Sequence, residues 1–241
     1  MPQAEPDLRL DGYEAVNARV EETFWQHIAI NLDMLTVLAK HHTDGDQHSY
    51  YVLHNGAVTW GTPGDPQLVA LHLQRDPAAR TFRFQHATLP LPAMAQSWLI
   101  ARGCPTDAIR LPPGMGTSPA DGATRALEER LMSDGDHFAL ITSYTDDTSA
   151  LPETTVFLRA LDERAPLPFR VLLEEVDVEA GTHTLREGGF TTFEAATHWW
   201  ENHWAGEALP LPIAPPQTRH SSLPAPPARP APATPPRRPT R

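Results

Sequence analysis

The sequence predicts an α+β protein in which antiparallel sheets pack against helices, followed by a disordered, proline-rich C-terminal tail. Three observations lead to this prediction: an apolar repeat of three and four residues near the N-terminus, alternating apolar runs in both halves, and an abrupt change of composition near residue 207. The residues before that change are enough for one large domain or two small ones. We expect two units, residues 1–105 and 118–207, and a tail over 208–241.

The first element expected is a long helix over residues 12–42. Asp11 is a suitable N-cap, and Glu14, three residues on, completes a capping box. Apolar residues then recur at helical spacing: Val16, Val20, Phe24, Ile28, Leu32, Leu35 and Leu38. This stripe predicts a helix that packs against its own sheet, and the alternative is a homodimer seam through the same helix.

The rest of the first unit is expected to contain strands and one short helix. Asn55-Gly56 suits a type I′ turn, so residues 50–60 are expected to form a hairpin. Residues 66–77 suit a helix or a strand, whereas residues 81–89 alternate as a strand does. The remaining expectations are a helix over 92–102 that ends at Gly103, and a linker over 104–117.

The second unit is expected to run from a helix through four strands to a final helix. Ser118 to Asp121 combine an N-cap, a first-turn proline and an acidic residue, which predicts a helix to about residue 132. The strands are expected over 137–145, 154–161, 169–179 and 183–190, and the last helix after Thr191. Two short similarities, FRF with FRV and PAMAQSW with EAATHWW, leave open whether both units are similar α-β(n)-α repeats.

The charge distribution limits the functions that we expect. The formal net charge of the chain is −11. All 30 acidic residues precede residue 208, whereas residues 208–241 carry five arginines and twelve prolines. An acidic body repels nucleic acids and anionic membranes, so nucleic-acid contact is expected only through the tail. A single cysteine, the lack of a signal peptide and the lack of an 18-residue apolar run favour a cytoplasmic protein that does not enter membranes.

No nucleophile motif is present in the sequence, so we expect no enzyme site. A GxSxG elbow is absent, and no histidine is tied to a serine by spacing. The alternative is a hydrolase whose site is assembled from distant residues, with Ser143, Asp146 and His137 as the candidates.

One histidine-rich segment suggests a metal site as an alternative to a solvated loop. His41, His42, Asp44, Asp46 and His48 offer imidazole and carboxylate ligands within eight residues. A stable site also needs fixed geometry, which a glycine-containing loop does not supply by itself. We therefore expect no metal and no cofactor.

Three carboxylates alternate along one expected strand. Glu175, Asp177 and Glu179 would share a strand face, either as a solvated surface or as a docking ridge for a basic partner. The nearest basic candidates are tail residues, namely Arg229, Arg237 and Arg238.

Taken together, these features predict a non-catalytic, cytoplasmic protein-interaction or accessory module with an unidentified protein partner. The hydrolase described above is one alternative. A DNA-associated accessory protein that contacts phosphates through the tail arginines is the other.

Overall fold

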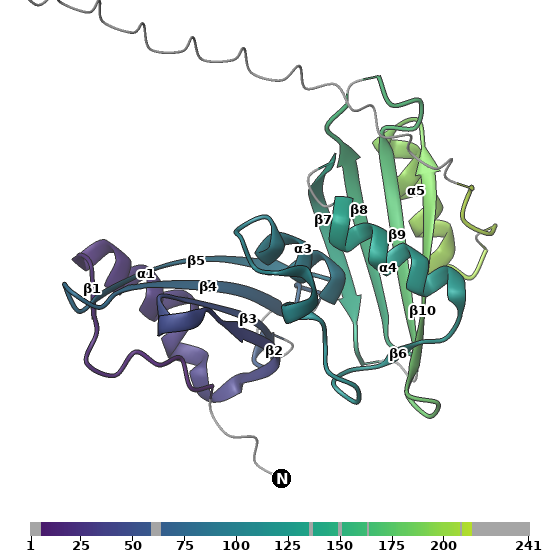
Figure 1. Ribbon diagram of the computed structural model, residues 1–241. Coiled ribbons are helices and arrows are strands. Elements are labelled where there is room, and N and C mark those ends of the chain that lie inside the picture. The colour runs from purple at the N-terminus through teal and green to yellow at the C-terminus, as the bar shows by residue number, and fades with distance from the viewer. Residues whose placement is uncertain are drawn as a thin grey trace, which may run out of the picture.

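A computed structural model describes residues 6–58, 64–134, 137–148, 151–162, 164–207 and 209–213 (Figure 1). The chain forms two five-stranded sheets in succession, each accompanied by helices, so the predicted α+β class is confirmed. The strand orders are β1-β5-β4-β3-β2 and β6-β10-β9-β8-β7. In each sheet the first short strand pairs in parallel with the last strand, and the other four strands are antiparallel.

The first unit contains the sheet β1–β5 and two described α-helices. Its elements are β1 (Glu14–Ala15), α1 (Ala18–His27), the 3₁₀ helix η1 (Ala29–Met34), β2 (Leu35–His42), η2 (Asp44–Asp46), β3 (His48–Asn55), β4 (Leu68–Asp76), β5 (Thr81–Leu89), α3 (Pro92–Ile100) and η3 (Thr106–Ile109).

The second unit repeats this order. Its elements are β6 (Ser118–Pro119), α4 (Gly122–Asp134), β7 (Phe138–Asp146), β8 (Glu153–Ala160), β9 (Phe169–Asp177), β10 (Thr182–Phe190) and α5 (Phe193–Trp204).

The two units agree in local detail as well as in topology. β9 and β10 have the same lengths as β4 and β5 and lie 101 residues later in the chain. Asn17 caps α1 by accepting a hydrogen bond from the Val20 amide, and Asp121 accepts the same bond from the Thr124 amide before α4. The edge strands β2 and β7 carry an irregularity at the same place, after Val37 and after Leu140. The units are therefore two copies of one β-α-β4-α arrangement.

Of the two sequence similarities, only one matches this repeat. PAMAQSW lies in α3 and EAATHWW lies in α5, which are equivalent helices. FRF lies in β5 and FRV lies in β9, which are not equivalent strands.

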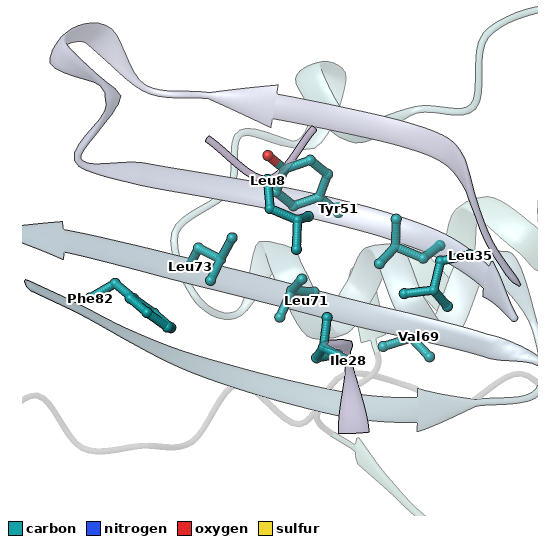
Figure 2. Packing of buried hydrophobic residues seen from close by; sticks show 9 residues of the cluster. Leu8, Ile28, Leu35, Tyr51, Val69, Leu71, Leu73 and Phe82 are labelled. Atoms are coloured by element: carbon teal, nitrogen blue, oxygen red, sulfur yellow. The ribbon is translucent and has the colours of Figure 1, made fainter. Parts of the chain in front are cut away.

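Each sheet is covered on both faces. In the first unit, Leu8, Ile28 and the apolar face of α1 cover one face, where Leu71 and Leu73 are fully buried (Figure 2). Helix α3 and η3 cover the other face. In the second unit α4 covers one face and α5 the other. Each fully buried leucine stabilises the fold by about 1.5–3 kcal/mol.

The two units are joined through their helices. Leu91 and Ala93 of the first unit pack into the same buried cluster as Leu127, Leu131 and Met132 of α4. Helices α3 and α4 thus lie between the two sheets, as Figure 1 shows. This contact brings the start of β4 and the residues after β5 close to residues 117–119, where the second unit begins.

The expected helix over residues 12–42 is wrong. Only α1 is α-helical there, and it starts at Asn17 rather than Asp11. Residues 35–42 form β2, because pairing with β3 buries Leu35 and Ala39 in the sheet. The β-branched pair Thr36-Val37 suits a strand, so tertiary pairing overrides the helical spacing. The expected homodimer contact was based on one continuous helix, which is not present over residues 12–42. Val20 and Phe24 of its apolar stripe pack against their own sheet.

The expected hairpin at Asn55-Gly56 is also wrong. β3 ends at Asn55, and its partners are β2, which precedes it, and β4. The hairpin turn is the loop after His42, which joins β2 to β3. Residues 66–77 resolve into β4.

The start of the expected tail lies against the second unit. The Trp199 indole donates to the Leu209 carbonyl at 2.8 Å, and the Gly189 amide donates to the Pro212 carbonyl at 3.1 Å. A side chain at Gly188 would meet Leu211, so this glycine admits the returning segment. Residues 214–241 lie outside the described residues. None of the described helices is both long and apolar enough to cross a membrane.

Candidate functional site

A cavity of about 420 Å³ lies where the two units meet. Its floor is the α4 face of the second sheet, and one wall is α4 itself. Residues 110–119, which connect the units, form its roof. The first unit contributes Leu38, Gln67, Leu68, Pro90, Pro92 and Gln96.

The floor is a row of polar side chains on three neighbouring strands, with a histidine of the fourth strand beside it. Thr145, Thr154 and Glu174 stand directly opposite one another on β7, β8 and β9. His183 stands on β10 opposite Val176, which shares a face with Glu174. All four polar side chains line the cavity. Leu185 stands opposite Glu174 on β10, and Leu172 precedes Glu174 on the same face of β9, so buried apolar side chains border the polar row.

His183 is the centre of a hydrogen-bonded chain in this row. It is buried, and its Nε2 lies 3.0 Å from Oε1 of Glu128 on α4. Its Nδ1 lies 2.9 Å from the Thr117 hydroxyl of the roof. Burial alone would lower the pKa of His183, but the Glu128 hydrogen bond and the charges of Glu174 and Glu128 raise it above its usual value.

Glu174 is the other ionisable group of the floor. Its carboxyl is partly buried and has no hydrogen-bond partner among the described residues. Burial raises its pKa from 4.5 to about 7, and the nearby charge of His183 opposes this change only in part. Since charged groups are costly to bury without a partner, this carboxyl is available to a group that enters the cavity.

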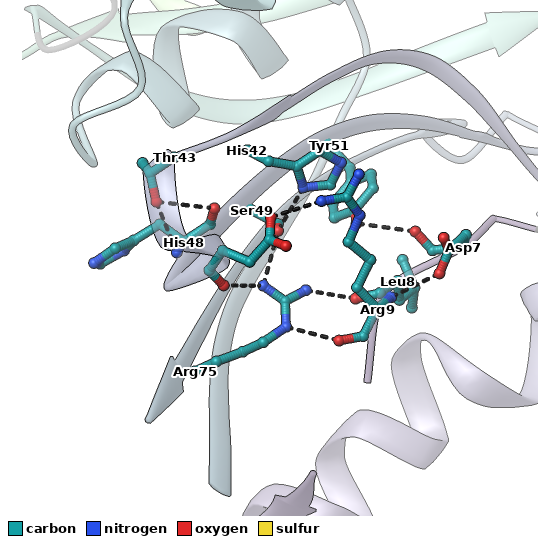
Figure 3. Close-up of polar contacts among 10 residues, drawn as sticks. Asp7, Leu8, Arg9, His42, Thr43, His48, Ser49, Tyr51 and Arg75 are labelled. Atoms are coloured by element: carbon teal, nitrogen blue, oxygen red, sulfur yellow. Dashed lines mark hydrogen bonds and ion pairs between the residues drawn. The ribbon is translucent and has the colours of Figure 1, made fainter. Parts of the chain in front are cut away.

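The equivalent row of the first unit is also polar, but it is filled. His42, Ser49 and Leu73 stand where Thr145, Thr154 and Glu174 stand in the second unit. His42 Nδ1 lies 2.7 Å from the Ser49 hydroxyl (Figure 3). Arg75 takes the position of Val176 and donates to Ser49 at 2.9 Å.

The N-terminal segment closes the row of the first unit. Arg75 donates to the backbone carbonyls of Leu8, Arg9 and Asp46, and Leu8 itself is buried in the core (Figure 3). Counting from the paired strands β1 and β6, residues 7–10 correspond to residues 111–114, which form the roof of the cavity. Gly12 and Gly116 correspond as well, and both have a positive φ. The same segment is therefore hydrogen-bonded to the sheet through Arg75 in the first unit, whereas in the second unit it lines a cavity above the sheet.

The candidate catalytic residues do not come together. His137 is exposed before the start of β7, and Asp146 is the last residue of that strand, about 30 Å away at the usual rise per residue. Asp146 accepts hydrogen bonds from Thr148, and the Ser143 hydroxyl is buried without a partner among the described residues. Among the described residues, Ser49 lies within hydrogen-bond distance of a histidine, His42, but it is fully buried and also hydrogen-bonded to Arg75.

The candidate metal ligands lie on different faces of the first sheet. His42 faces Ser49 on the α1 side, whereas His48 contacts His72 on the α3 side. Asp46 pairs with Arg9. Within the described part of the chain, no three His, Cys, Asp or Glu side chains are placed to hold a metal ion.

The candidate docking ridge is shorter than expected. Glu175 and Asp177 are exposed on the α5 side of β9, but Glu179 lies in the turn after the strand. Asp177 accepts a hydrogen bond from the Ala180 amide, so one of the carboxylates stabilises that turn. The proposed basic partners Arg229, Arg237 and Arg238 lie outside the described residues.

The residues of the cavity were not singled out from the sequence. One signal was present: Glu174 occupies an inward position of the apolar run FRVLLEEV, where an isolated carboxyl is unusual. The link from His183 to Glu128 and Thr117 spans 55 and 66 residues, so no local pattern marks it.

Comparison with known proteins gives no further guidance, because no family model, curated protein or solved structure matches this chain.

Proposed function

We propose that this protein is a non-catalytic binding module, an accessory or regulatory protein that takes a ligand group into the cavity between its two units. The observation that carries this proposal is the open polar row of the second unit, with a Glu174 carboxyl that no described residue pairs. A polar cavity lined by both units suits binding, since a ligand there would also bridge them.

The surroundings of His183 favour binding over catalysis. A base that activates a hydroxyl must accept its proton, but the raised pKa of His183 favours the imidazolium form. In that form Nδ1–H donates to the Thr117 hydroxyl and Nε2–H donates to Glu128. Thr117 is then held in place rather than activated.

A hydrolase is the second candidate, because Thr117, His183 and Glu128 form a hydroxyl–imidazole–carboxylate chain in a cavity. Assaying the protein against a panel of p-nitrophenyl esters tests it. Turnover that Thr117→Val and His183→Gln both abolish would favour the hydrolase over the binding module.

Fragment screening by NMR tests the binding module directly. We expect a mixed library of cationic, neutral and anionic fragments to give some binders, whose amide shift changes group on β8, β9, β10 and residues 110–119. A library from which no fragment perturbs these amides would contradict the proposal. Binding confined to the α5 face would contradict it as well.

A further inference from the structure

We infer that the cavity binds an alkyl guanidinium group, which pairs with Glu174 in the place that the Arg75 guanidinium occupies in the first unit. This inference rests on the proposed function and names the chemical class of its ligand.

The first unit shows what completes such a row. The Arg75 guanidinium lies between Ser49 on the sheet and the carbonyls of Leu8 and Arg9 on the N-terminal segment. It has contacts on both sides, so it fixes the segment to the sheet (Figure 3). A planar group with five N–H donors suits this position, because the surrounding atoms are a hydroxyl and carbonyl oxygens.

The second unit has a hydroxyl and the equivalent backbone segment near this position, but no arginine. Thr154 stands at the position of Ser49, and Pro112 and Pro113 of the roof correspond in the repeat to Leu8 and Arg9. Val176 stands at the position of Arg75 and supplies no donor. Thr154, Pro112 and Pro113 all line the cavity, so the position that corresponds to the Arg75 guanidinium borders it.

Glu174 gives the vacant position its preference for a cation. Its equivalent in the first unit is Leu73, which is fully buried, so the carboxyl has no counterpart there. A guanidinium that enters beside Thr154 reaches the carboxyl and forms a charge-assisted pair. An alkyl chain behind the guanidinium would contact Leu38, Leu68 and Met115.

The other charges around the cavity leave this preference intact. On α4, Glu128 is paired with His183, and Glu129 faces the cavity together with the exposed Arg125. On the roof, Arg110 pairs with Asp107. Glu174 and Glu129 thus remain for an incoming cation, against the exposed charge of Arg125 and the charge of His183, which is hydrogen-bonded to Glu128.

The guanidinium has two possible sources, the chain itself and a separate ligand. Residues 214–241 contain Arg219, Arg229, Arg237, Arg238 and Arg241. The last described residue, Ile213, pairs with Gly188 on β10, the strand that also carries His183. At about 3 Å per extended residue, the 28 residues that follow are long enough to reach the cavity.

Calorimetric titration with butylguanidinium and butylurea tests the inference, because the two probes share their shape and differ in charge. Both are titrated at pH 8 into the full chain and into a full-chain variant in which Arg219, Arg229, Arg237, Arg238 and Arg241 are replaced by glutamine. Glu174→Gln is compared with Glu175→Gln, which alters an exposed neighbour on the opposite sheet face.

We expect butylguanidinium to bind, and to bind more tightly than butylurea. We expect Glu174→Gln to weaken it about tenfold or more, as the loss of a charge-assisted pair predicts, and Glu175→Gln to leave it unchanged. Tighter binding by the glutamine-substituted chain would identify the chain's own arginines as the occupant. Equal binding by both chains would identify a separate ligand.

Equal binding of the two probes, or unchanged binding after Glu174→Gln, would overturn the inference. So would the absence of butylguanidinium binding to both chains. If neutral or anionic fragments still bind the cavity in the NMR screen, the cation inference fails while the proposed function stands.

Discussion

The two units of this protein carry the same row of positions across the same four strands and use it in opposite ways. In the first unit, Arg75 and the segment around Leu8 close the row, and Leu73 belongs to the core. In the second unit, Val176 and Glu174 occupy the corresponding positions, and the equivalent segment forms the roof of a cavity. The difference shows that a few side chains at one end of a sheet decide whether a repeated fold is closed or open.

The comparison also separates stability from binding. The closed row satisfies its polar groups internally, which stabilises the first unit. The open row leaves one carboxyl without a partner, and this lowers stability while it provides a site for a ligand. The predictions below test each side of this contrast, from the largest expected effect to the smallest.

Removing the arginine of the closed row should have the largest effect. Arg75→Met leaves three backbone carbonyls without this donor and removes one of the two hydrogen-bond partners of Ser49, so we expect the free energy of unfolding to fall by about 3–5 kcal/mol. Urea denaturation followed by circular dichroism measures this change. Arg83→Met, on the exposed side of β5, is the matched control. An equal loss of stability in both variants would show that the hydrogen bonds of Arg75 do not stabilise the first unit.

Removing the carboxyl of the open row should stabilise the protein at high pH. The pKa of Glu174 is about 7 in the folded chain, whereas an exposed glutamate, as in the unfolded chain, has a pKa of 4.5. Between these two pH values the folded chain holds a proton that the unfolded chain has released. Stability therefore falls as the pH rises from about 4.5 to 7. We expect Glu174→Gln to raise the free energy of unfolding by about 1–3 kcal/mol at pH 8 and by much less at pH 4.5.

Thermal or urea unfolding at the two pH values measures this effect. Glu175→Gln, which removes an exposed carboxyl on the opposite sheet face, is the matched control, and an equal gain in both variants would count against the role of Glu174. A Glu174→Gln variant that is less stable than the parent at pH 8 would mean that the carboxyl is already paired.

The binding of butylguanidinium should depend on pH. Below pH 7 the proton on Glu174 must leave before the cation binds, so we expect affinity to fall about tenfold between pH 8 and pH 6. Calorimetry in two buffers of different ionisation enthalpy should detect the released proton near pH 6. The pH dependence due to this carboxyl should be absent in Glu174→Gln, and its persistence there would assign the proton to another group.

Placing the missing arginine in the second unit should have the smallest effect on stability. Val176→Arg copies Arg75, so its guanidinium should pair with Glu174 and weaken butylguanidinium binding several-fold, with a stability change under about 1 kcal/mol. Val178→Arg, at an exposed position in the following turn, is the matched control. Undiminished binding by Val176→Arg would show that the two rows are not equivalent.

Local pattern predicted those elements that pair with neighbours in sequence. The apolar runs of the second unit form β8, β9 and β10 close to their expected positions, and α5 begins with a threonine N-cap one residue from the expected position. Residues 12–42 misled because Leu35 and Leu38 continue a helical stripe by spacing alone, although Leu35 is buried in a strand. Spacing records which residues are apolar, whereas pairing with β3 decides their backbone conformation.

The residues of the candidate site could not be predicted from local sequence pattern for a related reason. Glu174 differs from its exposed neighbour Glu175 only in the sheet face to which it points, and the strand register sets that face. His183, Glu128 and Thr117 belong to three elements that meet only after the second sheet and α4 have packed.

By itself the sequence determined the α+β class, the strands of the second unit and the separation of acidic residues from the arginine-bearing C-terminal segment, since these follow from alternation, capping and composition. The tertiary structure alone decided that the chain contains two copies of one arrangement, that one copy is closed by Arg75, and that the other leaves a cavity. The physical reason is that a row of side chains across a sheet joins residues far apart in the chain. Its character depends on which of them face the same side and whether a charged group there has a partner.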